Sequence, residues 1–403
     1  MAESDEVRAL TRLASRELRD ATGGIGGVHA AVAARVFGRV GAVARPAQLA
    51  HDTISRGVYG SVRGGFAAAG LAADVALRAR DPGDGRAVSA SPRGAFALGV
   101  INGLWGDALE AEGSELAAPM SVRVGGRPVA PERAALAAAF PRARPRLAVF
   151  VHGLMETEQA WHPSEGESFG ERLAREGGWT ALELRFNSGL HVSENGRALA
   201  DLLAGIVAEW PVEVEQVALV GHSMGGLVAR SGAHQAAGEG AAWIGRVRHI
   251  VSLGSPHMGA PLAQGVHYAA HALHTVPELR PFARLLRRRS AGIRDLRTGS
   301  LVDADWAGRD PDALRAAACA EVPLLDGVAH CFVAATVTRD PRHPVGRLLG
   351  DALVLAPSAA GRSRTRRLEF RDEDGHHLGG AHHLALLRHP AVYERLRDWL
   401  AAP

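Results

Sequence analysis

The pattern of hydrophobic and polar positions changes near residue 147. From there to the C-terminus, short apolar runs alternate with longer segments whose apolar positions recur at helical spacing. Short apolar runs between helices are typical of strands that are buried on both faces, so the pattern predicts a parallel sheet covered by helices, an α/β architecture. The expected strands are 147–151, 180–186, 216–220, 249–253 and 331–337, and the expected helices are 198–210, 224–237 and 391–400.

The first 115 residues show helical spacing of apolar positions, with helices expected over 6–18, 28–43 and 65–77. The glycine-rich stretch 23–27 is expected to be a flexible turn rather than a phosphate loop, because no strand precedes it. The pattern divides the chain into a helical N-terminal extension over 1–115, a short β and linker segment over 116–145, and an α/β domain over 146–403 with a helical insertion at about 256–322.

Composition narrows the class of protein further. Of the 403 residues, 47% are hydrophobic, so the chain can bury a large core. The net charge is only +3 and no basic tract is interleaved with aromatic residues, so no nucleic-acid partner is expected. Cys319 and Cys331 give neither a disulfide framework nor a zinc pattern, and no cofactor or metal is expected. Neither a signal peptide nor a transmembrane segment is recognisable, so we expect a cytoplasmic location, with peripheral membrane contact left open.

Two Gly-x-Ser-x-Gly matches occur, one around Ser168 and one around Ser223. A nucleophilic serine in this motif needs a tight turn between a strand and a helix, which exposes its oxygen above the sheet. The apolar run 217–220 precedes Ser223 and a helical pattern follows it, whereas no strand precedes Ser168. Ser223 is therefore the predicted nucleophile, and Ser168 is expected in a loop or at a helix cap.

A nucleophilic serine also needs backbone N–H donors for the oxyanion that forms during the reaction. Met224 follows the serine at the start of a helix, so its amide is the first expected donor. His152, Gly153 and Leu154 directly follow the strand 147–151, where the second donor is expected. We predict the Leu154 amide for this role, with Met155 as the fallback, and expect His152 to shape the loop.

Three segments carry a resemblance to a known family. They are the strand and loop Leu-Ala-Val-Phe-Val-His-Gly-Leu over 147–154, the Gly-His-Ser-Met-Gly turn over 221–225, and Gly-Ser-Pro-His-Met-Gly-Ala-Pro over 254–261. Over about 146–400 the chain resembles α/β-hydrolase lipases and esterases, especially their triacylglycerol-lipase-like and GPI-inositol-deacylase-like branch. The resemblance implies an α/β-hydrolase fold with a helical lid or cap insertion, and a catalytic triad in the chain order Ser, acid, His.

The acid is expected after the strand 331–337, where Asp340 and Asp351 both fit. Asp351 is favoured because the family's acid also precedes an apolar pair and a Ser-Ala, although Ala352 stands where Gly is common. The base is expected shortly before the last helix. His383 matches the family's position best, with His382 as the first alternative and then His376 or His377.

The predicted function is a serine carboxylesterase or lipase that acts on an ester or lipid. The alternatives are a thioesterase or amidase with the same triad, a non-catalytic protein of hydrolase fold, and a protein that binds lipid surfaces through its N-terminal helices. The sequence leaves the oligomeric state open. Apolar residues of the insertion fit either an acyl pocket beneath a lid or a simply packed cap, among them Leu273, Val276, Leu279, Phe282, Leu285 and Leu286.

Overall fold

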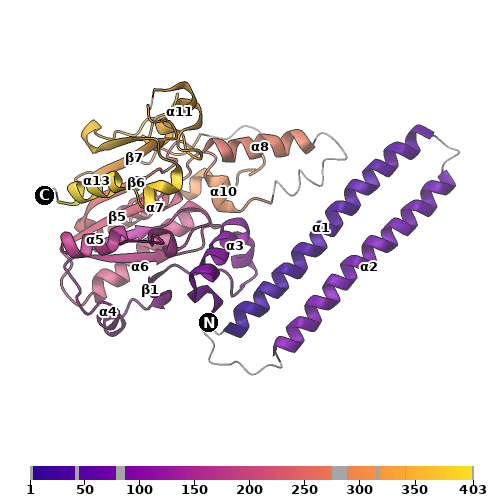
Figure 1. Ribbon diagram of the computed structural model, residues 1–403, viewed down its shortest axis with the longest axis horizontal. Coiled ribbons are helices and arrows are strands. Elements are labelled where there is room, and N and C mark those ends of the chain that lie inside the picture. The colour runs from indigo at the N-terminus through magenta and orange to yellow at the C-terminus, as the bar shows by residue number, and fades with distance from the viewer. Residues whose placement is uncertain are drawn as a thin grey trace. The chain divides into compact units, whose positions relative to one another are not determined.

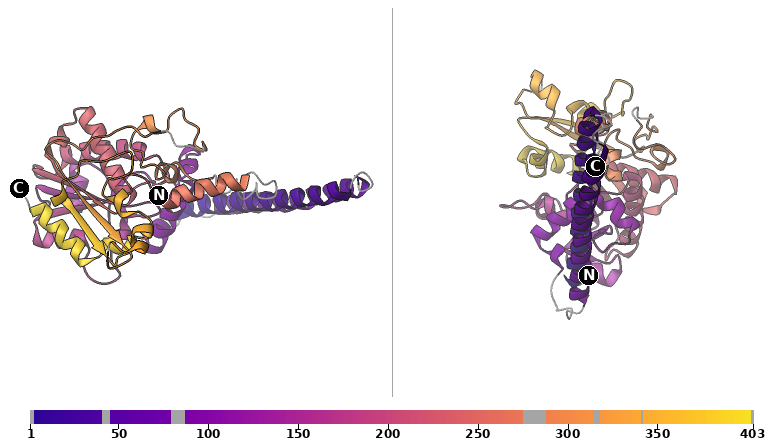
Figure 2. Two further views of the ribbon diagram at one scale, coloured as in Figure 1. Left: turned by 90° about the horizontal axis from the view of Figure 1, so that it is seen from above. Right: turned by 90° about the vertical axis from the view of Figure 1, so that its right-hand side faces the viewer.

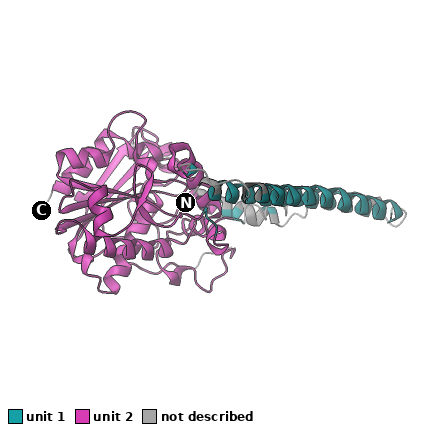
Figure 3. Ribbon diagram, turned by 90° about the horizontal axis from the view of Figure 1, so that it is seen from below, with its two compact units in different colours: residues 1–88, 114–116, 265–288 teal, residues 89–113, 117–264, 289–403 magenta. Residues whose placement is uncertain are grey.

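The computed structural model describes residues 3–40, 45–78, 87–274, 288–313, 318–340 and 342–401. The chain forms two compact units, which Figure 3 shows in different colours. The helical unit comprises residues 1–88, 114–116 and 265–288, and the sheet unit comprises residues 89–113, 117–264 and 289–403.

The sheet unit is built on one eight-stranded sheet in the order β2-β1-β4-β3-β5-β6-β7-β8. The hairpin β1-β2 adds to β4 in the antiparallel sense, and all pairs from β4 to β8 are parallel. The strands are β1 (Ser121–Val124), β2 (Arg127–Val129), β3 (Arg146–Val151), β4 (Trp179–Arg185), β5 (Gln216–His222), β6 (Val247–Leu253), β7 (Ala329–Thr336) and β8 (Gly375–Gly379).

Helices cover both faces of this sheet, as the labelled elements in Figure 1 and the views in Figure 2 show. Leu147 and Val149 of β3 face a core that contains residues of α4, α6 and α7. Ala148 and Phe150 face a second core that contains residues of α5 and α13. The helices of the sheet unit are α3 (Pro92–Ala111), α4 (Arg133–Ala139), α5 (Phe169–Glu176), α6 (Val192–Glu209), α7 (Met224–Gly238), α10 (Ala291–Asp295), α11 (Pro344–Leu349), α12 (Ala356–Ala359) and α13 (Pro390–Ala401).

The predicted α/β architecture is confirmed, because each apolar run expected to be a strand overlaps β3, β4, β5, β6 or β7, with 180–186 and 331–337 each ending one residue too late. Strands buried on both faces read as continuous apolar runs, which is why they were recognisable. β8 was missed. Its sequence, Gly-His-His-Leu-Gly over 375–379, has no apolar run, yet it pairs with β7 along its length. The sheet and its helices have the arrangement that the α/β-hydrolase resemblance implies.

The helical unit contains α1 (Glu3–Val40) and α2 (Arg45–Arg78), which run side by side in opposite directions in Figure 1. The turn expected at 23–27 is wrong, since this stretch lies inside α1. A Cβ atom on Gly26 would come within 3.1 Å of the Tyr59 ring of α2, and one on Gly70 within 2.5 Å of the Ser15 hydroxyl oxygen. These glycines permit close packing of two helices instead of a change in chain direction.

The N-terminal extension was placed over 1–115, whereas α3 (92–111) belongs to the sheet unit. Within the insertion at about 256–322, the structure describes α8 (Pro261–His274) and α10. None of the described helices is long and apolar enough to cross a membrane. Five of the residues expected in an acyl pocket or a packed cap lie outside the described residues, namely Val276, Leu279, Phe282, Leu285 and Leu286.

Candidate active site

Ser223 occupies a strained turn between β5 and α7. Its φ of 53° and ψ of −121° are rare for a residue with a side chain, and they cost free energy that the surrounding structure must supply. The Ser223 N–H donates to the Leu253 carbonyl at the end of β6 (2.8 Å), which fixes the turn against the neighbouring strand. Ser223 thus has the backbone geometry that a nucleophile between a strand and a helix requires.

The two glycines of this motif are required by close backbone approach. A Cβ atom on Gly221 would lie 2.3 Å from the Gly226 nitrogen, and one on Gly225 would lie 2.0 Å from the Val151 carbonyl oxygen. No side chain fits at either position without movement of the backbone. The motif therefore has a steric explanation at Ser223.

The second Gly-x-Ser-x-Gly match has a different explanation. Ser168 is the N-cap of α5, and its hydroxyl accepts the Glu171 N–H (3.1 Å). The Glu171 carboxylate accepts the Ser168 N–H in return (2.7 Å), which completes a capping box. The expectation of a helix cap at Ser168 is confirmed.

His383 and Asp351 form a buried pair. The His383 Nδ1–H donates to Asp351 Oδ2 (2.7 Å), and the His383 main-chain N–H donates to the Asp351 carbonyl (2.9 Å). The side chains are only 5% and 1% exposed. Asp351 Oδ1 accepts the N–H groups of Leu353 (3.0 Å) and Val354 (2.8 Å). These contacts fix the Asp351 carboxylate and use the Nδ1 side of the His383 ring. The Nε2 atom on the other side of the ring has no hydrogen-bond partner among the described residues.

Glycine contacts show how Ser223 and His383 are brought to one edge of the sheet. Gly254 directly follows Leu253, the residue that accepts the Ser223 N–H, and a Cβ atom on Gly254 would lie 3.1 Å from His383 Cε1. A Cβ atom on Gly153 would lie 3.0 Å from the Ser223 Cβ. The predicted nucleophile, base and oxyanion loop therefore meet at the carboxyl ends of β3, β5 and β6.

The alternative acid and bases are placed differently. Asp340 is exposed and its Oδ1 accepts the Arg342 N–H (2.8 Å), as an Asp at the start of a turn does. His382 is exposed, next to the buried His383. His376 and His377 belong to β8 and pair in register with Val333 and Ala334 of β7. Of these residues, the structure pairs only His383 with Asp351.

The predicted oxyanion loop, residues 152–155, follows β3. His152 is fully buried, its Nδ1–H donates to the Gly153 carbonyl (2.8 Å), and its Nε2 accepts the Phe186 N–H (3.2 Å). Burial lowers the pKa of His152 to about 4, so the ring is neutral and supports the loop. Met155 has a φ of 62° and donates its N–H to the Ser188 hydroxyl (3.1 Å). The Met155 amide, the second choice for the oxyanion donor, is therefore already used in a hydrogen bond.

The two preferred oxyanion donors are unoccupied. Within the described ranges, the main-chain N–H groups of Leu154 and Met224 have no hydrogen-bond partner. Met224 begins α7, where the aligned peptide dipoles favour negative charge. Both amides are thus available to an oxygen placed above Ser223.

Helix α3 supports the oxyanion loop, a role that the sequence did not suggest. A Cβ atom on Gly99 would lie 2.8 Å from the Glu156 carbonyl oxygen. A Cβ atom on Gly103 would lie 2.4 Å from the Met155 Cγ and 3.0 Å from its nitrogen. The glycines of α3 therefore let this helix pack directly on residues 155–156.

Glu156 and His222 form a second carboxylate–imidazole pair beside Ser223. His222 is fully buried, and its Nδ1 lies 2.9 Å from Glu156 Oε2, which also accepts the Gly153 N–H (2.7 Å). The His222 Nε2 lies 3.3 Å from the main-chain carbonyl oxygen of His383. Because a carboxylate and a carbonyl oxygen only accept, the two contacts together favour the form of His222 with a proton on each ring nitrogen.

Electrostatics agree with this assignment. Burial acts to lower the pKa of His222, but the charge of Glu156 and its hydrogen bond outweigh burial, so the pKa lies above its usual value. Burial acts to raise the pKa of Glu156, and His222 with the Gly153 N–H outweighs it, so the pKa is lowered. Sequence reasoning missed this pair, because Glu156 and His222 lie 66 positions apart and no motif connects them.

Comparisons with known proteins agree with the fold. Residues 182–284 match the family model of the PGAP1-like alpha/beta domain. This match contains Ser223 and confirms the expected resemblance to α/β-hydrolases. No curated protein matches the chain.

Several solved structures are similar at low identity. The mature lipase BlEst2 of Bacillus licheniformis is 19% identical with a TM-score of 0.41, over 65% of this chain and 94% of that chain. Phospholipase PlaB from Legionella pneumophila is 14% identical with a TM-score of 0.39, over 64% and 59%. A hyperthermophilic esterase from Pyrobaculum calidifontis is 16% identical with a TM-score of 0.36, over 82% and 93%. With TM-scores below 0.5, these likenesses carry no argument about this chain.

Proposed function

We propose that this chain is a serine hydrolase that cleaves carboxylic esters, with Ser223 as the nucleophile. One observation carries the proposal. Ser223 stands at a positive φ between β5 and α7, at the edge of the sheet where the buried pair His383–Asp351 also lies. A strained serine beside a carboxylate-oriented imidazole is the combination that acyl transfer requires.

The proposed reaction has two balanced halves. His383 Nε2 removes the Ser223 hydroxyl proton while the serine oxygen attacks the ester carbonyl carbon, and the amides of Leu154 and Met224 stabilise the resulting oxyanion. The oxyanion collapses, the bond to the alcohol oxygen breaks, and His383 returns the proton to the leaving alcohol. Water then repeats the sequence on the acyl-enzyme and releases the carboxylic acid. Asp351 holds the Nδ1–H tautomer and stabilises the transient imidazolium.

In this scheme Glu156 and His222 are positioning residues. The His222 imidazolium donates to the Glu156 carboxylate, which holds the Gly153 amide, and to the His383 carbonyl. One buried side chain thus connects the oxyanion loop to the segment that carries the base. Loss of its charge would loosen both, and a loosened site loses rate steeply.

The substrate class is proposed from the resemblance. The resemblance to lipases and esterases favours esters with an apolar acyl group, including lipids. Thioesters and amides react through the same acyl-enzyme intermediate, so they are the alternative substrates. A peripheral contact with a lipid surface through the helical unit belongs to the same proposal.

The test is covalent labelling and turnover with the full chain. A fluorophosphonate probe is expected to label the chain stoichiometrically, and p-nitrophenyl esters of several acyl lengths are expected to be hydrolysed. Ser223→Ala should abolish both. Ser168→Ala is the matched control: it sits in the same five-residue pattern, should cost about 1 kcal/mol of stability through its lost helix cap, and should leave labelling intact. Labelling that survives Ser223→Ala, or no labelling of the folded chain, would reject the proposal.

A further inference from the structure

A large cavity lies at the opposite edge of the sheet. Its volume is about 1010 Å³, and its lining includes Arg248 and His249 at the start of β6 and Ala329 and His330 at the start of β7. Ser223 is anchored at the other end of β6, at Leu253. With about 3.3 Å per residue, the two edges are roughly 16 Å apart along this strand. The cavity is therefore separate from the candidate active site and is argued independently of it.

His330 lines this cavity and has an unpartnered buried donor. Its side chain is only 6% exposed, and its Nε2 accepts the Leu325 N–H (2.9 Å). A neutral ring that accepts at Nε2 carries its proton on Nδ1. The Nδ1 atom is buried and has no hydrogen-bond partner among the described residues. Leaving such a donor unpaired lowers the stability of the folded protein by about 1–3 kcal/mol. A ligand that accepts from this donor would remove that cost.

Arg230 and His257 are two further buried donors near this cavity. Arg230 of α7 is 4% exposed, donates to the Val322 carbonyl (2.9 Å) and faces His257 Nδ1 (3.3 Å). Within the described ranges, no carboxylate lies in ion-pair distance of Arg230. Because His257 Nδ1 faces a guanidinium donor, its proton is on Nε2, which is also buried and unpartnered. Val322, which Arg230 contacts, also lines the cavity.

Arg230 has no ion-pair partner in the described part of the chain. Burial, and after it the charge of Arg230, lowers the pKa of His330 to about 3 and that of His257 well below its usual value. Both rings are therefore neutral donors, and the charge of Arg230 acts on both. Arg366, a half-buried residue of the cavity lining, adds a second guanidinium whose charge reaches Arg230.

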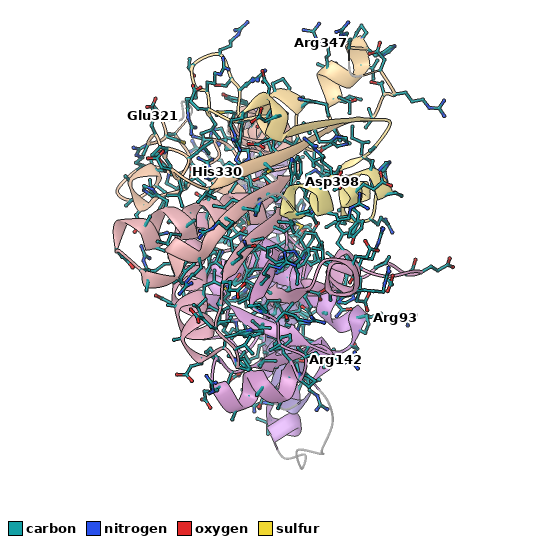
Figure 4. The ribbon with its side chains drawn as sticks, turned by 90° about the vertical axis from the view of Figure 1, so that its left-hand side faces the viewer. Arg93, Arg142, Glu321, His330, Arg347 and Asp398 are labelled. Carbon is teal, nitrogen blue, oxygen red and sulfur yellow. The ribbon has the colours of Figure 1, made fainter. Side chains whose placement is uncertain are left out.

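Acidic residues of the lining do not supply the missing acceptor. Asp374 is occupied by Arg371 (2.7 Å), and Glu321, Asp326 and Glu369 are exposed to water. Figure 4 shows the contrast, with the labelled Glu321 at the periphery and His330 over the sheet. Asp374, the one buried carboxylate of the described lining, therefore already has a partner, and the other three acids lie in water.

We infer that this cavity binds an oxyanion, a carboxylate or phosphate, carried on an apolar group. The anion accepts from His330 Nδ1 and is attracted by Arg366 and Arg230, which donate to the carbonyls of Thr298 and Val322 and have no carboxylate partner among the described residues. Leu324, Leu368 and Phe370 of the same lining provide an apolar surface for the rest of the ligand. The cavity has room for a ligand of ordinary small-molecule size.

The test measures binding to the full chain by calorimetry, with sodium decanoate, inorganic phosphate and decanol at matched ionic strength. Decanoate is expected to bind saturably and more tightly than decanol. Arg366→Gln should weaken decanoate binding about tenfold, the effect of one charge-assisted hydrogen bond. Arg364→Gln is the matched control, because Arg364 is an exposed arginine of the same loop outside the cavity lining.

The outcomes separate the sources of the ligand. Binding of phosphate that also depends on Arg366 supports a small oxyanion, and binding of decanoate alone supports an acyl carboxylate. Equal affinity for decanoate and decanol would overturn the inference. Decanoate binding that Arg366→Gln leaves unchanged would also overturn it, because decanoate would then bind elsewhere, for example as a product near Ser223. His330→Phe, checked for folding by circular dichroism, should reduce affinity in the same direction as Arg366→Gln.

Discussion

The sheet unit and the helical unit use apolar side chains in opposite ways. Leu147 to Val151 of β3 are completely buried, as are Val217 to Val220 of β5. In the helical unit, Leu49, Ile54 and Leu71 are each 67% exposed. A continuously buried strand fixes the position of whatever follows it, and here a loop and a serine follow. The candidate active-site residues thus follow the strands whose burial is complete, whereas the helical unit leaves large apolar side chains exposed.

The largest effect is expected from the acid. Asp351→Asn keeps the size of the side chain but replaces the carboxylate that accepts from His383 Nδ1. The amide favours the wrong imidazole tautomer, so kcat should fall about 10⁴-fold. The measurement is ester hydrolysis by the purified variant. Asp340→Asn is the control and should retain activity, since the contacts of Asp340 with described residues stay within its own turn. Equal losses in both variants would contradict the assignment of Asp351.

A smaller loss is expected when the backbone approach at the elbow is blocked. Gly225→Ala places a Cβ atom 2.0 Å from the Val151 carbonyl, so β3 and α7 must separate. The free energy of unfolding should fall by about 3 kcal/mol or more, measured by urea denaturation. Gly238→Ala lies at the end of the same helix with no atom within 4 Å, and should stabilise by about 0.5–1 kcal/mol. A tolerated Gly225→Ala would remove the steric explanation of the motif.

Part of this architecture was predictable from the sequence. Strands buried on both faces and the serine between a strand and a helix are local patterns, so β3, β5 and α7 were found. β8 was missed because its residues are polar and glycine-rich, and its pairing with β7 is set by tertiary contacts. The Glu156–His222 pair and the packing of α3 on the oxyanion loop join residues distant in the chain. Helical spacing in the first 78 residues predicted helices, but the glycines in α1 looked like a turn because their neighbour, α2, is not visible in the local pattern.

The Glu156–His222 pair predicts a moderate effect with a distinctive pH dependence. Glu156→Gln removes the charge that keeps the pKa of the buried His222 above its usual value of 6.5. In the parent protein, protonated His222 stabilises the folded state fully below pH 6.5, and this stabilisation is lost as the pH rises through the raised pKa. In the variant the pKa of His222 is lower, so the same loss occurs at lower pH. We expect kcat to fall about tenfold and the alkaline decline to shift downward.

The matched control for this pair is Glu183→Gln. Glu183 also pairs with an imidazole, His162 (2.6 Å), but that imidazole is 41% exposed and is not a neighbour of Ser223 in the sequence or the sheet. Rates and pH profile should be unchanged. If Glu156→Gln lowers the rate without moving the profile, its role is packing of the loop and not the charge of His222.

The smallest effect is expected in the helical unit. Ile54→Gln and Val58→Gln replace side chains that are 67% and 55% exposed, so each should change the free energy of unfolding by less than about 0.5 kcal/mol and leave the hydrolysis of soluble esters unchanged. Gly70→Leu is the contrast, because its side chain meets Ser15 of α1 and should cost about 1–3 kcal/mol. If Ile54→Gln proves as costly as Gly70→Leu, the exposed apolar residues of α2 are covered in solution, by lipid or by a second copy. Gel filtration and vesicle flotation of the parent chain distinguish these two covers.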